Sequence, residues 1–356
     1  MNSQLHPVRS ALCGQDVIEY LTSYFPHARR TLFIGNLGFS PDTIFSPGLL
    51  APLKNVDFRF LIEQRPDIPK EVNELAEACE VELRSLLNGR LVVERIAVCA
   101  TDGAPVGGRN ACRQAQAWIT AAEYSDVVLD ATGMSRGTCF PVARQLVEHG
   151  RAHGIRVHLV VADSETPVSG SIQSVSGERP DWIHGFQANV DTDEMGAALR
   201  LWVVQLKEGS GPVLNRLFTH LDTPGEVCPI VPFPSADALT GDRLLYTLRE
   251  RWVDDWGESP LSLIYADESD PTDVYRSIRD LHTARQESLH GANVRFVTIL
   301  SPLGRRLSSI GMFLAAEEYD LPVAYLETVG YKVNGPLVLT PRDQPDRIWC
   351  FRYHHS

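Results

Sequence analysis

The chain has 356 residues, a length that favours two domains of about 150 residues each, and its hydrophobic fraction of 44% is enough for globular cores. The formal net charge of −12 argues against generic binding to DNA, RNA or an anionic membrane, because such binding needs dense cationic patches. The charge does not exclude binding of a small phosphorylated ligand by a few local arginines. The seven cysteines include no CxxC pair, so neither a zinc ribbon nor a redox dithiol is indicated.

The first half of the chain alternates between predicted strands and helices. The strands are apolar runs at 31–35, 57–62, 91–99, 126–130 and 156–162. Helices are predicted at 16–24, at 71–87 and after the turn at 102–110, ending at residue 122. The chain begins without a secretion signal, and no run reaches the roughly 18 apolar residues of a membrane span. We therefore expect a soluble cytoplasmic protein.

The sequence changes character at the start of the second half. Residues 163–181 are polar and rich in turn formers, which predicts a loop or mobile lid close to the ligand. Further elements are expected in chain order: helices at 197–207 and 213–221, a proline-dense connection at 224–234, a helix at 237–255, a strand at 261–266 that opens the second sheet, a helix at 273–289, a strand at 322–327, and a hairpin of 336–340 with 348–353.

This pattern predicts an α/β fold: two Rossmann-like, mainly parallel open sheets in tandem, with flanking helices. The expected domains are 1–185, a connection of helices and a proline-rich linker at 186–235, and 236–356.

Two segments, 126–144 and 294–316, run from a strand through a small polar loop with arginine into a helix. In open parallel sheets, ligands bind beyond the carboxyl ends of the strands, where free N–H groups at a helix start suit an anion. The alternative is that Thr132 and Ser301 cap helices while the arginines are solvated. The candidate ligand-binding residues are Asn36, Gly38, Thr132, Gly133, Ser135, Arg136, Ser301, Gly304, Arg305 and Arg306.

The loop Asp130-Ala-Thr-Gly-Met-Ser-Arg136 resembles the binding loop of CARF domains, which are Rossmann-like sensors of cyclic oligonucleotides in CRISPR-linked defence. The segment 300–306 is similar, and two such units in one chain resemble SAVED domains. This chain departs from the Thr-Gly-Gly-Thr-Lys-like turn of the family, with Met134 in place of the second glycine and Arg136 in place of lysine. The resemblance implies a nucleotide sensor in a bacterial defence system, with an effector supplied as a separate protein.

Carboxylates near strand ends are the candidate catalytic residues. Asp130 and Asp163 follow neighbouring predicted strands, and Asp267 lies just past the strand at 261–266, where carboxylates can act as acid and base or hold a cation. Each could instead cap a helix or begin a solvated turn. His149 and His153 have the spacing of metal ligands on a helix, but no metal site is predicted.

Three functions remain open from the sequence. The first is a binding module for a nucleotide or a cyclic oligonucleotide-like anion in a cleft at the strand carboxyl ends, as a sensor or accessory subunit. The second is an enzyme acting on a nucleotide or phosphorylated small molecule, and the third is a non-catalytic scaffold. The G-x-x-G spacing of Gly35 and Gly38 is not the dinucleotide fingerprint, so no cofactor is identified. A homodimer is left open.

Overall fold

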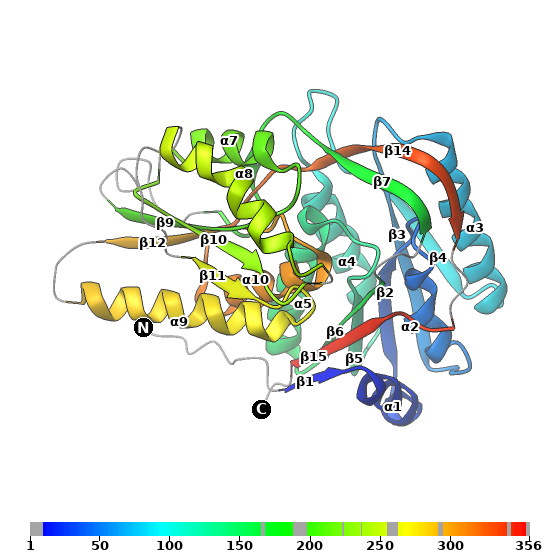
Figure 1. Cartoon of the computed structure of the whole chain (residues 1–356). Coiled ribbons are helices and arrows are strands. Elements are labelled where there is room, and N and C mark those ends of the chain that lie inside the picture. Colours follow the sequence, from blue (N-terminus) through cyan, green and yellow to red (C-terminus); the bar gives the residue numbers. More distant parts are fainter. Residues whose placement is uncertain are drawn as a thin grey trace. The chain divides into compact units, whose positions relative to one another are not determined.

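The computed structural model describes residues 10–164, 168–187, 198–222, 224–235, 237–254, 263–290, 295–339 and 343–353. The chain forms two compact units. One comprises 6–177 together with 327–356, and the other comprises 178–326 with the first five residues. Both are α/β with mainly parallel open sheets, as the sequence predicted (Figure 1). The chain from 327 onward returns to the first unit, a return that the sequence-based boundaries did not include.

A seven-stranded sheet forms the centre of the unit that contains 6–177. Its order is β1-β15-β6-β5-β2-β3-β4. The strands are β1 (Ser10–Cys13), β2 (Thr31–Asn36), β3 (Val56–Gln64), β4 (Leu91–Ala97), β5 (Asp126–Asp130), β6 (Arg156–Asp163) and β15 (Arg347–Tyr353). Five of them, β2 to β6, run parallel, while β15 is antiparallel to both β6 and β1. The direction of winding reverses between β2 and β5, so the switch point where ligands bind in such sheets lies between the loops that follow these two strands.

Helices cover both faces of this sheet. They are α1 (Gln15–Tyr24), the 3₁₀ turn η1 (Phe25–His27), α2 (Asp42–Leu50), α3 (Lys70–Leu86), α4 (Gly107–Ile119) and α5 (Arg136–His153). Buried residues of α1, α2 and α3 form one hydrophobic cluster with Phe33, Phe58 and Phe60 of the sheet. On α5, Phe140, Val142 and Leu146 are also buried. Every residue of β2 and β5 is buried, which explains why both strands have nearly continuous apolar sequences.

The other unit is built on a parallel sheet of order β11-β10-β9-β12. The strands are β9 (Leu199–Gln205), β10 (Glu226–Pro232), β11 (Ile264–Ala266) and β12 (Phe296–Ser301). Its helices are α7 (Gly211–His220), α8 (Thr240–Asp254), α9 (Pro271–Leu289) and α10 (Arg306–Tyr319). In Figure 1, α7 and α8 lie on one face of the sheet and α9 on the other. The winding reverses between β9 and β12, which places this unit's switch point between the loops that follow them.

Two short antiparallel ribbons complete the described structure. The β7 strand (Val168–Ser176) pairs with β14 (Thr328–Leu339), and β8 (Asp181–Trp182) pairs with β13 (Ala324–Tyr325). The prediction of a mobile loop over 163–181 was therefore wrong for 168–176, which is a paired strand. The predicted tail hairpin was also wrong, because β14 pairs with β7 and β15 pairs with β6 and β1.

Two further sequence predictions were wrong. The helix expected at 197–207 is strand β9, and the connection expected at 224–234 contains strand β10. The helices expected at 71–87, 213–221 and 273–289 were confirmed as α3, α7 and α9. Among the described residues, none of the helices has the length and apolar character needed to cross a membrane. All seven cysteines are free thiols.

Candidate functional site

The two loops at the switch point of the seven-stranded sheet contact each other directly. Asn36, the last residue of β2, donates from Nδ2 to the carbonyl oxygen of Gly133 at 2.6 Å. A side chain at Gly133 would overlap the Asn36 carbonyl oxygen and come within 2.8 Å of Thr43 Cγ2. Gly38 also lies close, since a Cβ there would be 3.8 Å from the Gly133 carbonyl oxygen. The predicted residues Asn36, Gly38 and Gly133 therefore meet at the switch point and pack closely against each other there.

Asp130 and Thr132 hold the chain in place at the end of β5. The Asp130 carboxylate accepts the Thr132 N–H at 2.9 Å, and the Thr132 hydroxyl oxygen accepts the Ala162 N–H at 2.9 Å. Asp130 pairs in register with Val160, so Asp163 lies three residues further along β6 and faces the opposite side of the sheet. The two carboxylates proposed as an acid and base pair are therefore not brought together.

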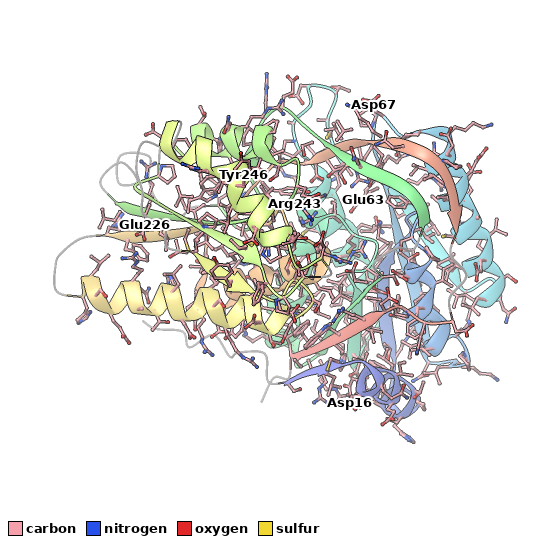
Figure 2. The ribbon with its side chains drawn as sticks, in the orientation of Figure 1. Asp16, Glu63, Asp67, Glu226, Arg243 and Tyr246 are labelled. Atoms are coloured by element: carbon pink, nitrogen blue, oxygen red, sulfur yellow. The ribbon has the colours of Figure 1, made fainter. Side chains whose placement is uncertain are left out.

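The amino end of α5 is occupied by carboxylates of the protein itself. Glu63, on β3 and labelled in Figure 2, accepts the Ser135 N–H at 3.0 Å and a charged hydrogen bond from Arg65. Glu327 packs its carboxylate against Gly137, where any side chain would overlap it. Both residues are buried, Glu63 with 5% and Glu327 with 7% of its surface exposed. The anion that the sequence predicted at the Ser135–Arg136 helix start is thus supplied from within the chain.

Burial and the neighbouring Glu63 carboxylate raise the pKa of Glu327 to about 7. The Arg65 and Arg136 guanidiniums and the Thr328 N–H act in the opposite direction by favouring the ionised form. Arg136 is therefore engaged electrostatically with an internal carboxylate. This is the arrangement expected if the first loop has a structural role.

In the four-stranded unit, two of the predicted residues also have internal roles. The Ser301 hydroxyl donates to the Ala324 carbonyl oxygen and accepts from Trp202 Nε1, both at 2.9 Å. Asp267 accepts from the N–H and hydroxyl of Ser269 within a turn, and Asp270, three residues further along, caps α9. Neither Ser301 nor Asp267 lines the pocket described next.

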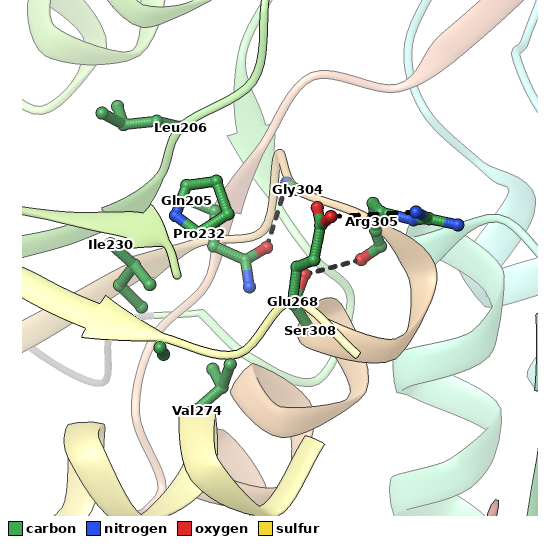
Figure 3. Close-up of a pocket in the computed structure, with 10 residues that line it drawn as sticks. Gln205, Leu206, Ile230, Pro232, Glu268, Val274, Gly304, Arg305 and Ser308 are labelled. Atoms are coloured by element: carbon green, nitrogen blue, oxygen red, sulfur yellow. Dashed lines mark hydrogen bonds and ion pairs between the residues drawn. The ribbon is translucent and has the colours of Figure 1, made fainter. Parts of the chain in front are cut away.

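A pocket opens at the carboxyl ends of β9, β10 and β11, beside the start of α10 (Figure 3). It contains about 260 Å³ of empty space and is open to solvent. Its apolar wall includes Ile230, Pro232 and Val274, and its polar lining is Gln205, Glu268, Gly304, Arg305 and Ser308. Gly304 and Arg305, both predicted from the sequence, therefore line a real cavity. Arg306 is the first residue of α10 and is not part of this lining.

Gln205 is the most informative polar residue of the pocket. Its Oε1 accepts the Gly304 N–H at 3.0 Å and the Ser309 hydroxyl at 3.3 Å. This fixes the orientation of the amide, because a flipped amide would set its NH₂ group against the Gly304 N–H, which can only donate. Gln205 is 2% exposed, and its Nε2 is buried with no hydrogen-bond partner among the described residues. Figure 3 shows this nitrogen directed away from Gly304 and toward the side of Val274.

The charged groups of the pocket lie at the start of α10. Arg305 is the N-cap residue, and no side chain of the described residues caps the helix. The Arg305 guanidinium lies 3.8 Å from the Glu268 carboxylate, a long and partly exposed ion pair. Gly304 has no room for a side chain, because a Cβ would lie 2.9 Å from Gln205 Oε1 and from Ser308 Oγ. The pocket thus combines a helix start that no described side chain caps, a cation and a buried N–H donor.

Sequence reasoning missed Gln205, Glu63 and Glu327. Gln205 lies near the end of a segment that was predicted to be a helix, so its position at the end of a strand could not be predicted. Glu63 follows a correctly predicted strand, and a polar residue directly after an apolar run was a usable signal. The stacked pair His149 and His153 is explained locally, by a ring nitrogen of His153 at 2.9 Å from the His149 carbonyl oxygen. Within the described ranges, no group of three or more potential ligands is placed to hold a metal ion.

Comparisons with known proteins give no family for this chain. No family model matches it, and no curated protein matches it. Among solved structures, the cytoplasmic domain of a prokaryotic cation chloride cotransporter is similar at 8% sequence identity, over 84% of this chain and 96% of that one. The TM-score is 0.23, which is too low to carry an argument about fold or function.

Proposed function

We propose that the four-stranded unit binds a small ligand bearing an anionic group, of nucleotide type, in the pocket at its strand carboxyl ends. The observation that carries the proposal is the buried Nε2 of Gln205, which has no partner among the described residues. Leaving a buried donor unsatisfied costs about 1–3 kcal/mol, so such groups are rare unless a ligand or water accepts from them. The location at a switch point, which is where ligands bind in parallel sheets, supports the same proposal.

The anionic end of the ligand is assigned to the start of α10. Backbone N–H groups and the helix dipole favour negative charge there, and the Arg305 guanidinium adds a charge-assisted donor. The acidic Glu268 lies on the same lining and suits hydroxyl donors such as those of a ribose. The empty space of about 260 Å³ includes open solvent, so the enclosed part of the pocket is far below the roughly 300–1,000 Å³ of sites that enclose drug-sized ligands. The pocket therefore suits an anionic group such as a phosphate, and the rest of a larger ligand would lie in solvent.

The proposed role is that of a sensor or accessory subunit, as the resemblance to CARF and SAVED domains implies. The first Arg-bearing loop has a different role in this proposal. Its Ser135 N–H and Arg136 face Glu63 and Glu327, so it serves as a scaffold rather than as a second ligand site.

Titration calorimetry with the full chain tests the proposal, using inorganic phosphate, AMP and a cyclic dinucleotide as probes. Arg305→Ala should weaken binding of the tightest probe by about tenfold or more, because a hydrogen bond to a charged group contributes about 1.5–3 kcal/mol. Gln205→Glu should also weaken it, since the variant keeps the acceptor for Gly304 and replaces the buried donor by a carboxylate oxygen. Arg306→Ala is the matched control and should change the affinity less than twofold.

Two results would refute the proposal. One is that none of the probes binds, and the other is that Arg305→Ala and Arg306→Ala weaken binding equally. Chromatography of the recovered probe then separates the sensor from the enzyme, because a sensor returns the probe unchanged and an enzyme converts it.

A further inference from the structure

The β7–β14 ribbon has its base on the carboxyl edge of the seven-stranded sheet, within the same unit. Arg65, just past β3, donates from Nε to the Thr328 carbonyl oxygen at 2.9 Å. The N–H of Tyr331 donates to the Asp67 carbonyl oxygen at 3.1 Å, and the Tyr331 ring packs edge-on against Phe39 at 5.2 Å between ring centroids. The ribbon is thus attached to the loops that follow β2 and β3. It has no wider sheet to hold it, since β7 and β14 pair with each other alone among the described strands.

The attachment point contains two buried carboxylates. Glu327 directly precedes β14, and its carbonyl oxygen accepts the Gly177 N–H at 2.7 Å, which joins the two strands at their base. Its carboxylate accepts the Thr328 N–H at 2.9 Å and lies against Gly137. From β3, Glu63 faces it and shares the Arg65 guanidinium.

The remaining charged and titratable groups around Glu327 come from three further elements. Arg136 lies at the start of α5, Cys99 follows β4, and Tyr331 belongs to β14. Glu63 receives the Ser135 N–H and the Arg65 guanidinium. Because Arg65 is already engaged by Glu63, ionised Glu327 is a second buried carboxylate beside Glu63, which burial and repulsion disfavour.

We propose that the β7–β14 ribbon is a pH-responsive strap, held on the carboxyl edge of the seven-stranded sheet while Glu327 is protonated and loosened when Glu327 ionises beside Glu63. This inference concerns a different unit from the ligand pocket and does not depend on it. Opening of the strap would uncover the loops that follow β2 and β3.

The direction of the effect follows from the pKa of Glu327, which burial and Glu63 raise from 4.5 to about 7. A carboxyl group with a raised pKa binds its proton more tightly when buried than when exposed. Local opening that returns Glu327 to water therefore becomes easier as the pH rises above 4.5, and the effect levels off above about 7. With these two pKa values, the opening equilibrium should increase about tenfold from pH 6 to pH 8.

Hydrogen exchange of β14 amides in the wild type and in Glu327→Gln tests the strap. The glutamine variant keeps the shape of the protonated group and cannot ionise. The ratio of wild-type to variant exchange rates cancels the intrinsic effect of pH, and we expect it to rise about tenfold between pH 6 and pH 8. Amides at the ends of α1 that exchange by local fraying, which leaves Glu327 buried, are the internal control, and their ratio should not change.

A ratio for β14 that stays constant across this pH range would overturn the proposal. So would β14 amides that exchange as slowly as the core amides of α1, because that would mean unfolding of the whole unit rather than opening of the strap. If Glu327→Gln does not fold, the wild type alone gives the test. Exchange of β14 corrected for intrinsic rates should then show the tenfold rise relative to α1, and its absence would refute the strap.

Discussion

Replacing Gly133 by alanine tests whether the switch point of the seven-stranded sheet is closed, as the contact between its two loops indicates. The added methyl group would overlap the Asn36 carbonyl oxygen and approach Thr43 Cγ2 to 2.8 Å. The first of these atoms belongs to the backbone and Thr43 is 2% exposed, so neither can move away at low cost. Overpacking of this kind costs about 1–3 kcal/mol, and we place Gly133→Ala at the upper end.

Separating the loops would also break the hydrogen bond from Asn36 Nδ2 to Gly133, which contributes about 1 kcal/mol. The expected loss in the free energy of unfolding is therefore about 3–4 kcal/mol. For a unit of about 200 residues, this corresponds to a melting temperature lower by about 10 °C. The matched control is Gly38→Ala, where the nearest atom to an added Cβ is 3.8 Å away and a change below about 0.5 kcal/mol is expected.

Urea unfolding at pH 7, followed by circular dichroism, measures both variants. If Gly133→Ala is as stable as Gly38→Ala, the two loops do not touch in solution. The crevice between β2 and β5 would then be open, and the ligand site expected from the sequence at Thr132–Arg136 would have to be reconsidered.

Three further outcomes are expected. Asp126→Asn should lose about 3 kcal/mol of unfolding free energy in urea at pH 7, because Asp126 accepts from Tyr24, Ser125, Arg156 and His158 while fully buried. Those donors hold the pKa of Asp126 well below its usual range, so the difference should shrink as the pH falls below about 4. Glu327→Gln should be more stable than the wild type by up to about 3 kcal/mol at pH 8, with the difference declining toward pH 4.5, because the raised pKa makes the wild type lose stability as the pH rises. Maleimide at pH 8 should label exposed Cys13 and spare Cys79, Cys228 and Cys350 in intact-mass measurements, because burial raises the pKa of these three thiols to about 11, 12 and 12.

The central strands of the seven-stranded sheet could be predicted because burial on both faces leaves a continuous apolar sequence. β2 and β5 are buried along their whole lengths, and their predicted ranges agree with the observed ones to within a residue. The same reasoning gave the α/β class. It did not give strand order, which depends on pairing between distant segments.

Strand β10 shows why proline density was misleading. Pro229 lies inside the strand, although proline is usually excluded from central strands. The Ile230 carbonyl oxygen accepts from Leu206 of the β9 side, so by alternation the nitrogen of Pro229 faces the β11 side. Among the described residues, β11 begins at Ile264, opposite Ile230. No described residue of β11 therefore lies opposite Pro229, and this depends on where another strand starts.

The ribbon strand β7 could not be recognised for the opposite reason. Its glycine and serine residues give no apolar face, because it pairs with β14 instead of lying in a buried sheet. The pairing of β15 with β1 and β6 also cannot be predicted from the sequence of β15 alone, since both partners lie far away in the sequence. Long-range pairing decides both cases, and a pattern within one segment carries no information about it.

The two switch points explain why only part of the predicted site became a pocket. Each sheet places an amide side chain at the end of its first central strand and a glycine in the loop opposite, Asn36 with Gly133 and Gln205 with Gly304. Asn36 is the shorter side chain, and Gly133 lies so close to its backbone that no side chain would fit between them. Gln205 has one more methylene group and uses its oxygen to hold the Gly304 N–H, which leaves its nitrogen turned into the pocket. The sequence could indicate which strand ends carry polar residues. Whether such an end is closed or open depends on an approach of a few tenths of an ångström between loops, and residue types alone do not determine that distance.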